Sequence, residues 1–444
     1  MLKYKKIGNI MNERDTLKIN AKNHLEIGGV DTLELAQKYG TPLYVFDVSY
    51  IKNMCQIFSK TLKDYYGDGI ISYASKAFSC KEIYRLISKE NMGADVVSGG
   101  ELYTALSAGF SPENLYFHGY NKTDKALEHA IKSKVKTIII DSFEEADTLD
   151  ELAKKFGVKQ EVFIRINPGV EAHTHHYIQT AKVDSKFGFS ISNGDALDIV
   201  LYVKEKKNLN LTGLHCHIGS QIFEKKSFAI AVDKMTDFYK LLKENHGVSF
   251  DKLNLGGGFG IYYSEGDAKL SYNDYAEYVK TICEKLNACV LEKGIKKPFL
   301  ILEPGRSIVG EAGITLYTAG NTKIIKNIKN YLSIDGGMFD NPRFALYQAK
   351  YTVVPAEKMR DARTIKYTIA GKCCESGDII AEDVLLPKMQ KGDIIAVLST
   401  GAYNYSMASN YNRNFVPPVV FVNNGESYYA VKPQTFEDIT RNDI

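Results

Sequence analysis

The stretch "IISYASKA" at positions 70–77 decides the fold of this chain. Its isoleucines, tyrosine and small residues are typical of a strand that is buried on both faces, and Lys76 follows this run directly. A lysine there is either the solvated end of a strand or a primary amine held for a function. On its own the pattern favours the solvated end, because most lysines lie on the surface. The choice depends on what the rest of the chain builds around this strand.

Seven further runs of the same kind follow, and amphipathic stretches separate them. Between the runs, apolar residues recur at intervals of three and four, and glycine ends several stretches, as in helices. Strict alternation of strand and helix predicts a parallel sheet, and eight such units in about 250 residues have the size of a closed (β/α)8 TIM barrel. The predicted strands cover 70–75, 93–98, 115–119, 135–141, 161–167, 211–217, 251–258 and 298–305.

After the eighth strand the pattern changes to short β runs with hairpin signals, among them the turn dipeptide Asn424-Gly425. We therefore predict an α/β barrel over 46–309 and a C-terminal, mostly antiparallel β domain over 310–444. The β-like "TPLYVFD" at 41–47 indicates that the N-terminal segment, 1–45, joins the β domain. The predicted strands of this domain lie in 331–337, 350–357, 364–371, 393–403 and 419–431.

Composition excludes several classes of function. The net charge is +3, and no basic run is interleaved with aromatic residues, so we expect no nucleic-acid partner. No segment approaches the ~18 uninterrupted apolar residues of a membrane span, and no apolar leader opens the chain. The seven cysteines are odd in number and form no CxxC pair, which argues against a disulfide framework and a zinc ribbon. We expect a cytoplasmic protein that does not bind membranes.

One histidine cluster raises the question of a metal. The run "HTHH" at 173–176 has the ligand type, but no ordered cysteine or carboxylate companions accompany it. We interpret the run as part of a polar lid loop and expect no metal site.

Polar residues stand at the ends of the predicted barrel strands. The carboxyl ends of these strands meet on one face, where TIM barrels carry their chemistry. A ring that mixes histidine, aspartate, glutamate and a lone lysine predicts a site, and it makes Lys76 a functional amine. The strand-end residues are Lys76, Ser98, His118, Asp141, Asn167, His217, Gly256 and Glu303.

The motif "NLGGGFG" at 254–260 ends the seventh strand with three glycines. Their backbone N–H groups can approach an anion closely, although a tight turn alone would also explain the run. A dinucleotide fingerprint would need glycine at position 261, which is Ile261. One strand later, "EPGR" sets Glu303 and Arg306 beside this nest. An amine, a phosphate nest and a carboxylate in one barrel mouth are what pyridoxal 5'-phosphate (PLP) needs: Lys76 for the covalent bond, glycines and Arg306 for the phosphate, and Glu303 for the pyridine nitrogen.

Longer motifs carry a resemblance over most of the chain. In order they read "SYASKA", "GADVVSGGEL", "GLHCHIGSQI", "LNLGGGFG", "EPGRSIVGEAG", "CCESGD" and "GAYNYSMASNYN". This set closely resembles the diaminopimelate decarboxylase family of fold-type III PLP enzymes, which implies an alanine-racemase-like barrel with a C-terminal β domain. It also implies decarboxylation of meso-2,6-diaminopimelate to L-lysine and CO2, the last step of lysine biosynthesis. Two departures stand out: Asn404 replaces the usual glycine, and "MFDNPRFALYQAKY" at 338–351 is a variant segment.

The resemblance implies roles for single residues. Asp95 would lie near the Lys76 amine, and His217 would stack on the pyridine face. The implied cofactor contacts are Lys76, Asp95, His217, Ser220, Gly256, Gly257, Gly258, Glu303, Gly305, Arg306 and Tyr403.

Substrate contacts follow from the same resemblance and from charge. Once one amine has reacted, the site must still hold a distal carboxylate and a distal ammonium, which suit arginine and glutamate respectively. Cys374 would give a proton to the carbon that loses CO2, because thiols exchange protons near neutral pH, while Cys373 would serve packing. The implied substrate contacts are Arg306, Arg343, Tyr347, Glu375 and Tyr403.

The family also implies a homodimer with shared active sites, in which the "CCESGD" loop of one chain reaches the neighbouring barrel. Two alternatives stay open. One is a related decarboxylase of ornithine, arginine or carboxynorspermidine, which would gain nothing from Arg343 and Tyr347. The other is a regulatory homologue without activity, which would be expected to lose Lys76, Cys374 or the glycine nest, and all three are present.

Overall fold

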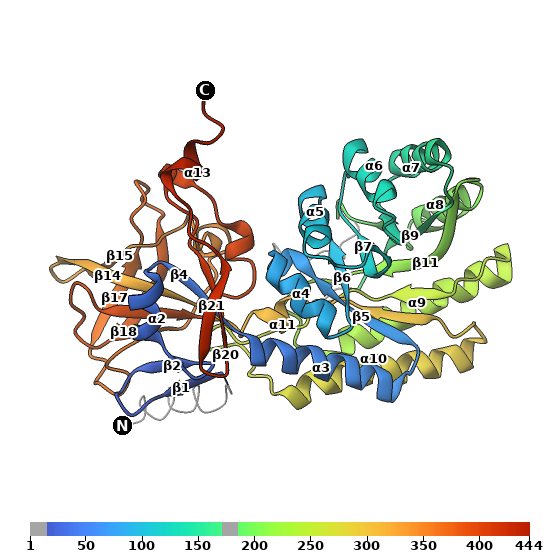
Figure 1. Cartoon of the computed structure of the whole chain (residues 1–444). Coiled ribbons are helices and arrows are strands. Elements are labelled where there is room, and N and C mark those ends of the chain that lie inside the picture. The colour runs from blue at the N-terminus through green and yellow to red at the C-terminus, as the bar shows by residue number, and fades with distance from the viewer. Residues whose placement is uncertain (1–15, 171–184) are drawn as a thin grey trace. The chain divides into compact units, whose positions relative to one another are not determined.

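The structure is a computed structural model that describes residues 16–170 and 185–444. The chain divides into two compact units, which we describe separately (Figure 1). One unit consists of Met54–Gly260 and Leu270–Ser307. The other combines the described residues up to Asn53 with Ile261–Lys269 and Ile308–Ile444. The predicted "HTHH" cluster lies outside the described residues.

The first unit is a closed barrel of eight parallel strands, as predicted. Each strand pairs with the next along the chain, and the last pairs with the first to close the ring. A two-residue strand, β10 (Phe189–Ser190), adds one further parallel pairing to β9. The barrel strands are β5 (Gly69–Ala74), β6 (Gly93–Val96), β7 (Leu115–Phe117), β8 (Thr137–Ile140), β9 (Gln160–Asn167), β11 (Leu209–Cys216), β12 (Lys252–Asn254) and β13 (Phe299–Leu302).

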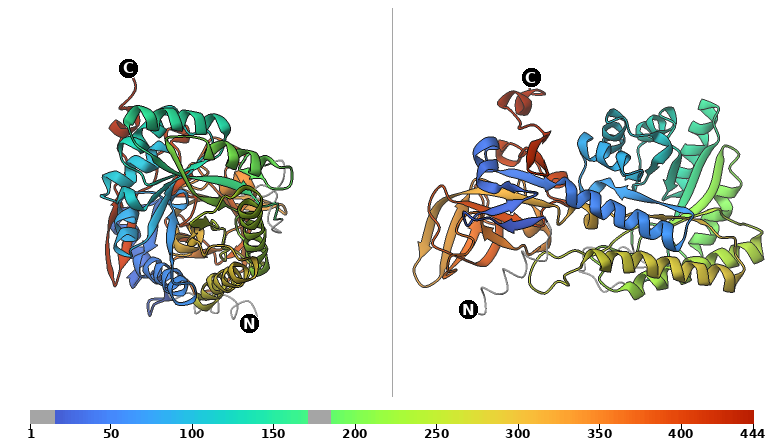
Figure 2. Two further views of the ribbon diagram at one scale, coloured as in Figure 1. Left: turned by 90° about the vertical axis from the view of Figure 1, so that its right-hand side faces the viewer. Right: turned by 60° about the horizontal axis from the view of Figure 1, so that its bottom comes forward.

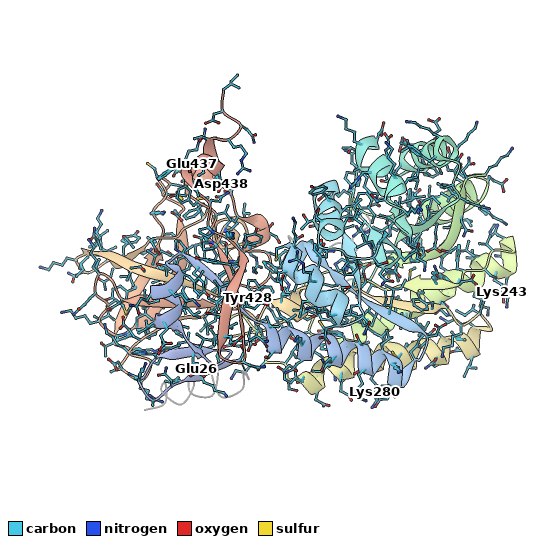
Figure 3. All side chains as sticks on the ribbon, in the orientation of Figure 1. Glu26, Lys243, Lys280, Tyr428, Glu437 and Asp438 are labelled. Atoms are coloured by element: carbon cyan, nitrogen blue, oxygen red, sulfur yellow. The ribbon has the colours of Figure 1, made fainter. Side chains whose placement is uncertain are left out.

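Helices surround these strands, as the left view of Figure 2 shows. Ser98, Thr123, Ser142 and Ser271 cap helix N-termini through their side chains, so local sequence sets where these helices begin. Charged side chains such as Lys243 and Lys280 project from the outer helices (Figure 3). The helices are α3 (Val48–Tyr65), α4 (Lys81–Lys89), α5 (Gly99–Ser107), α6 (Asp124–Lys132), α7 (Phe143–Phe156), α8 (Asp195–Lys204), α9 (Lys225–His246), α10 (Tyr272–Lys293) and α11 (Arg306–Val309).

The barrel interior is filled with side chains. Tyr116, Ile139, Phe163 and Ile301 come from four different strands and form one buried cluster, which is possible only inside the ring. The rings of Tyr116 and Phe163 lie 6.3 Å apart between centroids. This packed interior supports the polar residues that follow the strands at their carboxyl ends.

The second unit is a mostly antiparallel β structure, as predicted. Its sheet runs β18-β17-β15-β14-β4-β20-β21, and β19 pairs with both β14 and β16. Only the pairs β15–β17 and β20–β4 are parallel among these described strands. The strands are β4 (Leu43–Asp47), β14 (Gly313–Ile325), β15 (Lys329–Ile334), β16 (Val353–Pro355), β17 (Ile365–Ala370), β18 (Ile379–Leu386), β19 (Ile394–Leu398), β20 (Val419–Asn423) and β21 (Glu426–Val431).

The N-terminal segment contributes to this unit. Strand β4 lies between β14 and β20. Before it, β1 (Leu17–Ile19), β2 (Leu25–Ile27), β3 (Val30–Asp31) and α2 (Thr32–Tyr39) pack their apolar residues against the core that β4, β14 and β20 share. Two short helices, α12 (Arg343–Tyr347) and α13 (Phe436–Thr440), complete the unit.

The sequence prediction missed the short strands β1 to β3 and two strands of the large sheet in the second unit. Strand β14 has 13 residues but is buried only in its first half, so no single alternation runs through it. Strand β18 carries Glu382 and Asp383 at its centre, and Asp383 has a left-handed backbone with φ 56°, which interrupts the pattern.

Among the described residues, no helix is long and apolar enough to cross a membrane.

Candidate active site

Lys76 lies in a single turn, Ser75–Ala77, directly after the first barrel strand. Its Nζ is 3.3 Å from Asp95 Oδ2, at the end of β6. The Asp95 side chain is 1% exposed, whereas that of Lys76 is 36% exposed, so the amine faces the accessible side. The Ser75 hydroxyl donates to the Asp95 carbonyl at 2.6 Å and fixes this turn. The structure thus places an accessible amine beside a buried carboxylate.

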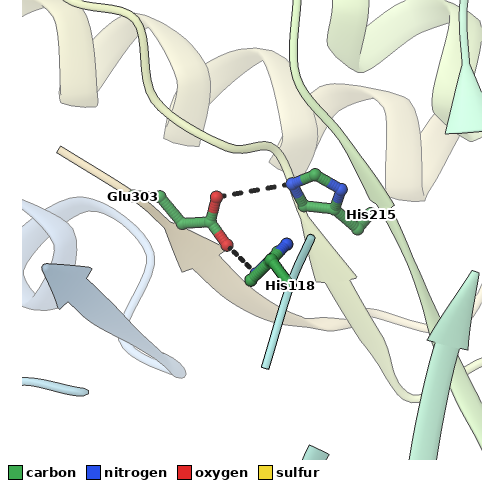
Figure 4. A group of neighbouring side chains, drawn as sticks. All are labelled: His118, His215 and Glu303. Atoms are coloured by element: carbon green, nitrogen blue, oxygen red, sulfur yellow. Dashed lines mark ion pairs between the residues drawn. The ribbon is translucent and has the colours of Figure 1, made fainter. Parts of the chain in front are cut away.

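Glu303 follows the last barrel strand and stands at the centre of a buried polar group (Figure 4). Asn254 Nδ2 donates to Glu303 Oε1 at 2.6 Å. His118 Nε2 lies 2.8 Å from Oε1, and His215 Nε2 lies 3.3 Å from Oε2. These partners come from or directly follow β7, β11 and β12, so the closed barrel brings them together. Both carboxylate oxygens are therefore held in a defined direction.

Burial decides the charges in this group. It lowers the pKa of His215 to about 3, so this imidazole is neutral. Burial alone would raise the pKa of Glu303, but the interactions with His118 and His215 hold it well below its usual range. The result is an ionised carboxylate enclosed by nitrogen donors.

His217 is a half-buried histidine that directly follows β11. Burial, with a contribution from the charge of Lys76, lowers its pKa well below the usual value. Its Nδ1 accepts a hydrogen bond from the Gly257 N–H at 3.3 Å, which assigns the remaining proton to Nε2. His217 is therefore a neutral ring whose orientation is set by the glycine run.

His215 and Asn254 are site residues that the sequence patterns did not predict, and His118 was predicted only as one of the strand-end residues. A signal for His215 was present in "LHCH" at 214–217. Alternate residues of a strand face the same side, so His215 and His217 share one face. Nothing local, however, indicates that these side chains meet a carboxylate from another strand.

The glycine run forms a cradle that no other residue would fit. A Cβ on Gly257 would lie 2.0 Å from the Glu303 carbonyl oxygen, and one on Gly258 would lie 2.2 Å from that of Gly219. Gly258 also has φ 109°, in the region that favours glycine. Only glycine allows this close approach to the neighbouring backbone, and the role of the run as an anion nest stays a prediction.

Arg306 and Ser220 lie at the same face of the barrel. Arg306 follows β13 as the first residue of α11, and its Nη2 donates to Ser220 Oγ at 2.9 Å. Gly305 packs tightly on β5, since a Cβ there would lie 2.8 Å from the Ala74 carbonyl oxygen. A buried guanidinium, a hydroxyl and the glycine nest together suit a phosphate group.

The two imidazoles and the carboxylate of this group are also residue types that bind metal ions. His118, His215 and Glu303 place their donor atoms within 4.8 Å of one another, and two imidazoles with a carboxylate are zinc ligands in many proteins. Here Glu303 Oε1 already accepts from Asn254 and lies near His118, while Oε2 lies near His215. The geometry fits a hydrogen-bonded carboxylate at least as well as a metal-ligand set.

The remaining predicted residues belong to the β unit. Cys374 and Glu375 are exposed on the loop between β17 and β18. The Asp378 carboxylate anchors this loop, because it accepts from Cys373 N at 2.7 Å and from Met338 N at 2.6 Å. Burial raises the pKa of Cys373 to about 12, which suits a packed thiol better than a proton donor.

Arg343 begins α12 and is buried, and Tyr347 ends the same helix. Arg343 Nη1 donates to Tyr351 Oη at 2.6 Å. Tyr403 is half-buried and has φ 66°, a left-handed conformation that is uncommon outside glycine. The structure thus groups the predicted site residues into a barrel set and a β-unit set.

Comparisons with known proteins agree with this arrangement. The pyridoxal-dependent decarboxylase family, by its pyridoxal binding domain, matches residues 49–310. The diaminopimelate decarboxylase of Bacillus subtilis is 47% identical over 97% of both chains, and that of Staphylococcus aureus is 44% identical over 96% of this chain and 99% of its own. The structure of the M. jannaschii diaminopimelate decarboxylase in complex with L-lysine has a TM-score of 0.87 at 34% identity, covering 97% of this chain and 98% of its own. The chain therefore belongs to the diaminopimelate decarboxylase family of pyridoxal-dependent enzymes.

Proposed function

We propose that this chain is a PLP-dependent carboxy-lyase that converts meso-2,6-diaminopimelate to L-lysine and CO2. The observation that carries the proposal is the barrel mouth, where the Lys76 amine, the glycine nest and the ionised Glu303 lie at the ends of neighbouring strands. The relatives that share 44–47% identity over nearly the whole chain are diaminopimelate decarboxylases. The M. jannaschii relative binds L-lysine, which is the product of the proposed reaction.

The residues of the barrel mouth fit PLP. Lys76 supplies the amine for covalent attachment, and Asp95 holds this amine in place. The glycine nest, Ser220 and Arg306 take the phosphate. When bound, PLP withdraws electrons from the substrate carbon that loses its carboxylate.

Glu303 would hold the pyridine nitrogen of the cofactor in this assignment. A carboxylate keeps that nitrogen protonated, which makes the ring a stronger electron acceptor. Asn254, His118 and His215 hold Glu303 ionised and in a fixed direction, and His217 would offer a neutral ring to the pyridine face. None of these residues reacts with the substrate. Asn254, His118 and His215 fix the charge and direction of Glu303.

Cys374 is the proposed proton donor to the carbon that loses CO2. Its side chain is exposed, and its backbone N–H donates to Asn412 Oδ1 at 2.9 Å, so the thiol sits on an anchored part of the loop. Cys373 is less suited, because its pKa is raised and it is partly buried. Access to substrate therefore favours Cys374.

We assign recognition of the distal end of the substrate to the predicted site residues of the β unit. Arg306, a further predicted substrate contact, belongs to the barrel residues that take the cofactor phosphate. Arg343, Tyr347 and Tyr403 suit the distal carboxylate, and the exposed Glu375 suits the distal ammonium. A substrate without a distal carboxylate would offer the buried Arg343 guanidinium no anionic group to bind. This favours diaminopimelate over ornithine or arginine as the substrate.

The active site is proposed to be shared in a two-fold homodimer. Lys76 belongs to the barrel unit, whereas Cys374 and Glu375 belong to the β unit. An isologous dimer then forms two equal sites, each with the barrel of one chain and the "CCESGD" loop of the other.

The proposed function is tested by a CO2-release assay on purified protein loaded with PLP. The substrates are meso-diaminopimelate, L-lysine, L-ornithine and L-arginine at equal concentration. We expect release from meso-diaminopimelate to exceed release from each of the others. Faster release from L-ornithine or L-arginine would favour the alternative decarboxylases, and release from none would favour a regulatory homologue.

A further inference from the structure

Arg343 is held by two tyrosines of its own unit. Its Nη1 donates to Tyr351 Oη at 2.6 Å, and its guanidinium lies 5.0 Å from the ring centroid of Tyr263 and 5.7 Å from that of Tyr351. The two rings meet edge to face, with centroids 5.4 Å apart. Burial lowers the pKa of Arg343, but the two tyrosines raise it by more, so its pKa lies above the usual value. The guanidinium is buried, charged and held on one side.

Tyr351 is itself held by Asn404, which is fully buried. The Asn404 amide lies 3.3 Å from Tyr351 Oη. Its hydrogen bonds assign the amide nitrogen to the side of the Thr400 and Ala402 carbonyls, at 3.2 and 3.1 Å, and of Tyr351 Oη. Its oxygen then accepts from Asn341 Nδ2 at 3.2 Å. The phenol oxygen accepts from Arg343 and from Asn404, which uses both of its lone pairs.

These contacts form a chain of three side chains. Asn404 lies 3.3 Å from the phenol oxygen of Tyr351, and that oxygen accepts from the Arg343 guanidinium at 2.6 Å. A glycine at position 404 would offer no side chain to Tyr351.

We infer that Tyr351 and Asn404 are positioning residues that fix Arg343 for the distal carboxylate of the substrate. The inference rests on the proposed function, in which Arg343 binds that carboxylate. A free arginine loses much side-chain freedom when it forms a paired hydrogen bond, and a guanidinium already fixed loses less on binding. The Arg343–Tyr351–Asn404 chain thus strengthens binding of ligands with a distal carboxylate and leaves the reacting atoms untouched.

The test compares two competitive inhibitors of the holoenzyme. L-lysine retains the distal carboxylate, whereas the diamine cadaverine has none. Tyr351→Phe should raise the KM for meso-diaminopimelate and the Ki of L-lysine by roughly tenfold, because it removes a hydrogen bond to a charged group, while kcat and the Ki of cadaverine stay within about twofold. Asn404→Gly should act in the same direction by roughly threefold, because it removes a neutral hydrogen bond one step further away.

Tyr367→Phe is the matched control. Tyr367 is a buried tyrosine in the same core cluster, and its Oη accepts from Met389 N at 3.3 Å, away from Arg343. This variant loses the same atom and should change neither Ki. Thermal unfolding of each variant checks that it folds. Asn404→Gly carries the test if Tyr351→Phe does not fold.

Arg343→Ala separates the inference from the proposed function. Suppose that Arg343→Ala weakens the binding of L-lysine far more than that of cadaverine, whereas Tyr351→Phe and Asn404→Gly weaken the binding of both inhibitors equally. The positioning role of Tyr351 and Asn404 is then wrong, and the role of Arg343 at the distal carboxylate stands. If Arg343→Ala also weakens the binding of both inhibitors equally, Arg343 does not bind the distal carboxylate. In the double variant Arg343→Ala/Tyr351→Phe, the second change should add no further loss in the Ki of L-lysine, and a full additive loss would overturn the inference.

Discussion

The group around Glu303 in the barrel unit and the Cys374 loop in the β unit differ in how much water reaches them. The side chains of Asp95, His215 and Glu303 are each at most 3% exposed and lie close to one another or to near neighbours. Cys374 and Glu375, in contrast, are exposed on a loop that Asp378 anchors. The buried group holds a fixed charge, which is worth most where water is excluded, whereas a proton donor must remain accessible. The predictions below test this division.

The largest effect is expected at Lys76. Lys76→Ala removes the amine that attaches the cofactor, so turnover should fall by several orders of magnitude. Borohydride reduction followed by peptide mass analysis should label Lys76 in the wild type and no lysine in the variant.

Lys243→Ala is the control for this change. Lys243 projects from the outer helix α9 (Figure 3) and donates to the Gly294 carbonyl. Its loss should leave both label and turnover unchanged. Labelling of a lysine other than Lys76 would remove Lys76 from the site.

A smaller loss of activity is expected when the buried charge of Glu303 is removed by a side chain of the same shape. Glu303→Gln should lower kcat by roughly 100-fold and raise KM little, because the interaction strengthens as charge develops in the reaction. Steady-state kinetics with meso-diaminopimelate measures both constants.

Glu161→Gln makes the same chemical change at the other end of the barrel. Glu161 is the second residue of β9, and its carboxylate pairs with Lys252 at 2.7 Å. This variant should retain kcat. A rise in KM alone at Glu303→Gln would place this residue at the substrate instead of the pyridine nitrogen.

Subunit mixing tests whether the two sets come from different chains. Lys76→Ala and Cys374→Ala, each inactive, are mixed and allowed to exchange subunits. Random exchange makes about half of the dimers mixed, and each mixed dimer has one intact site, so about a quarter of the wild-type activity should return.

Mixing Lys76→Ala with the double variant Lys76→Ala/Cys374→Ala gives the control, because no intact site can form. If exchange is verified by mass and no activity returns from the first mixture, both sets belong to the same chain.

The smallest effect concerns acid stability. An unfolded histidine titrates near 6.5, while the pKa of the buried His215 is lowered to about 3. Between these values the unfolded chain binds a proton that the folded chain does not. The free energy of unfolding should therefore fall as pH falls through this window, by at most about 1.4 kcal/mol per pH unit for this residue.

Urea unfolding at pH 7 and pH 5 measures this slope, and His215→Asn should make it shallower. His246→Asn, at the end of α9, removes a histidine outside the barrel mouth and should leave the slope as it is. An equal change in both variants would contradict the assignment to His215.

Local sequence was enough to predict the strands of the barrel and the residues at their ends. A strand and a helix have different hydrophobic periods, so the alternation that begins at 70–77 predicted all eight barrel strands, and it placed Lys76 at a strand end. Parallel strands joined by helices must end on one face, and this rule marked Glu303 and the glycine run as neighbours of that lysine. The strands of the β unit were predicted less completely, because β14 and β18 lack a regular alternation of buried and exposed residues.

Only the tertiary structure decided which side chains meet. The partners of Glu303 are residues 118, 215 and 254, and closure of the ring brings them together across more than 180 positions of sequence. Tyr263 belongs to Ile261–Lys269, which packs with the β unit although it lies between barrel elements, and so it reaches Arg343. Sequence periods encode local geometry and burial, whereas a contact between distant residues depends on the path of the whole chain. The charge of Glu303 and the direction of Arg343 are properties of such contacts, and no local pattern specifies them.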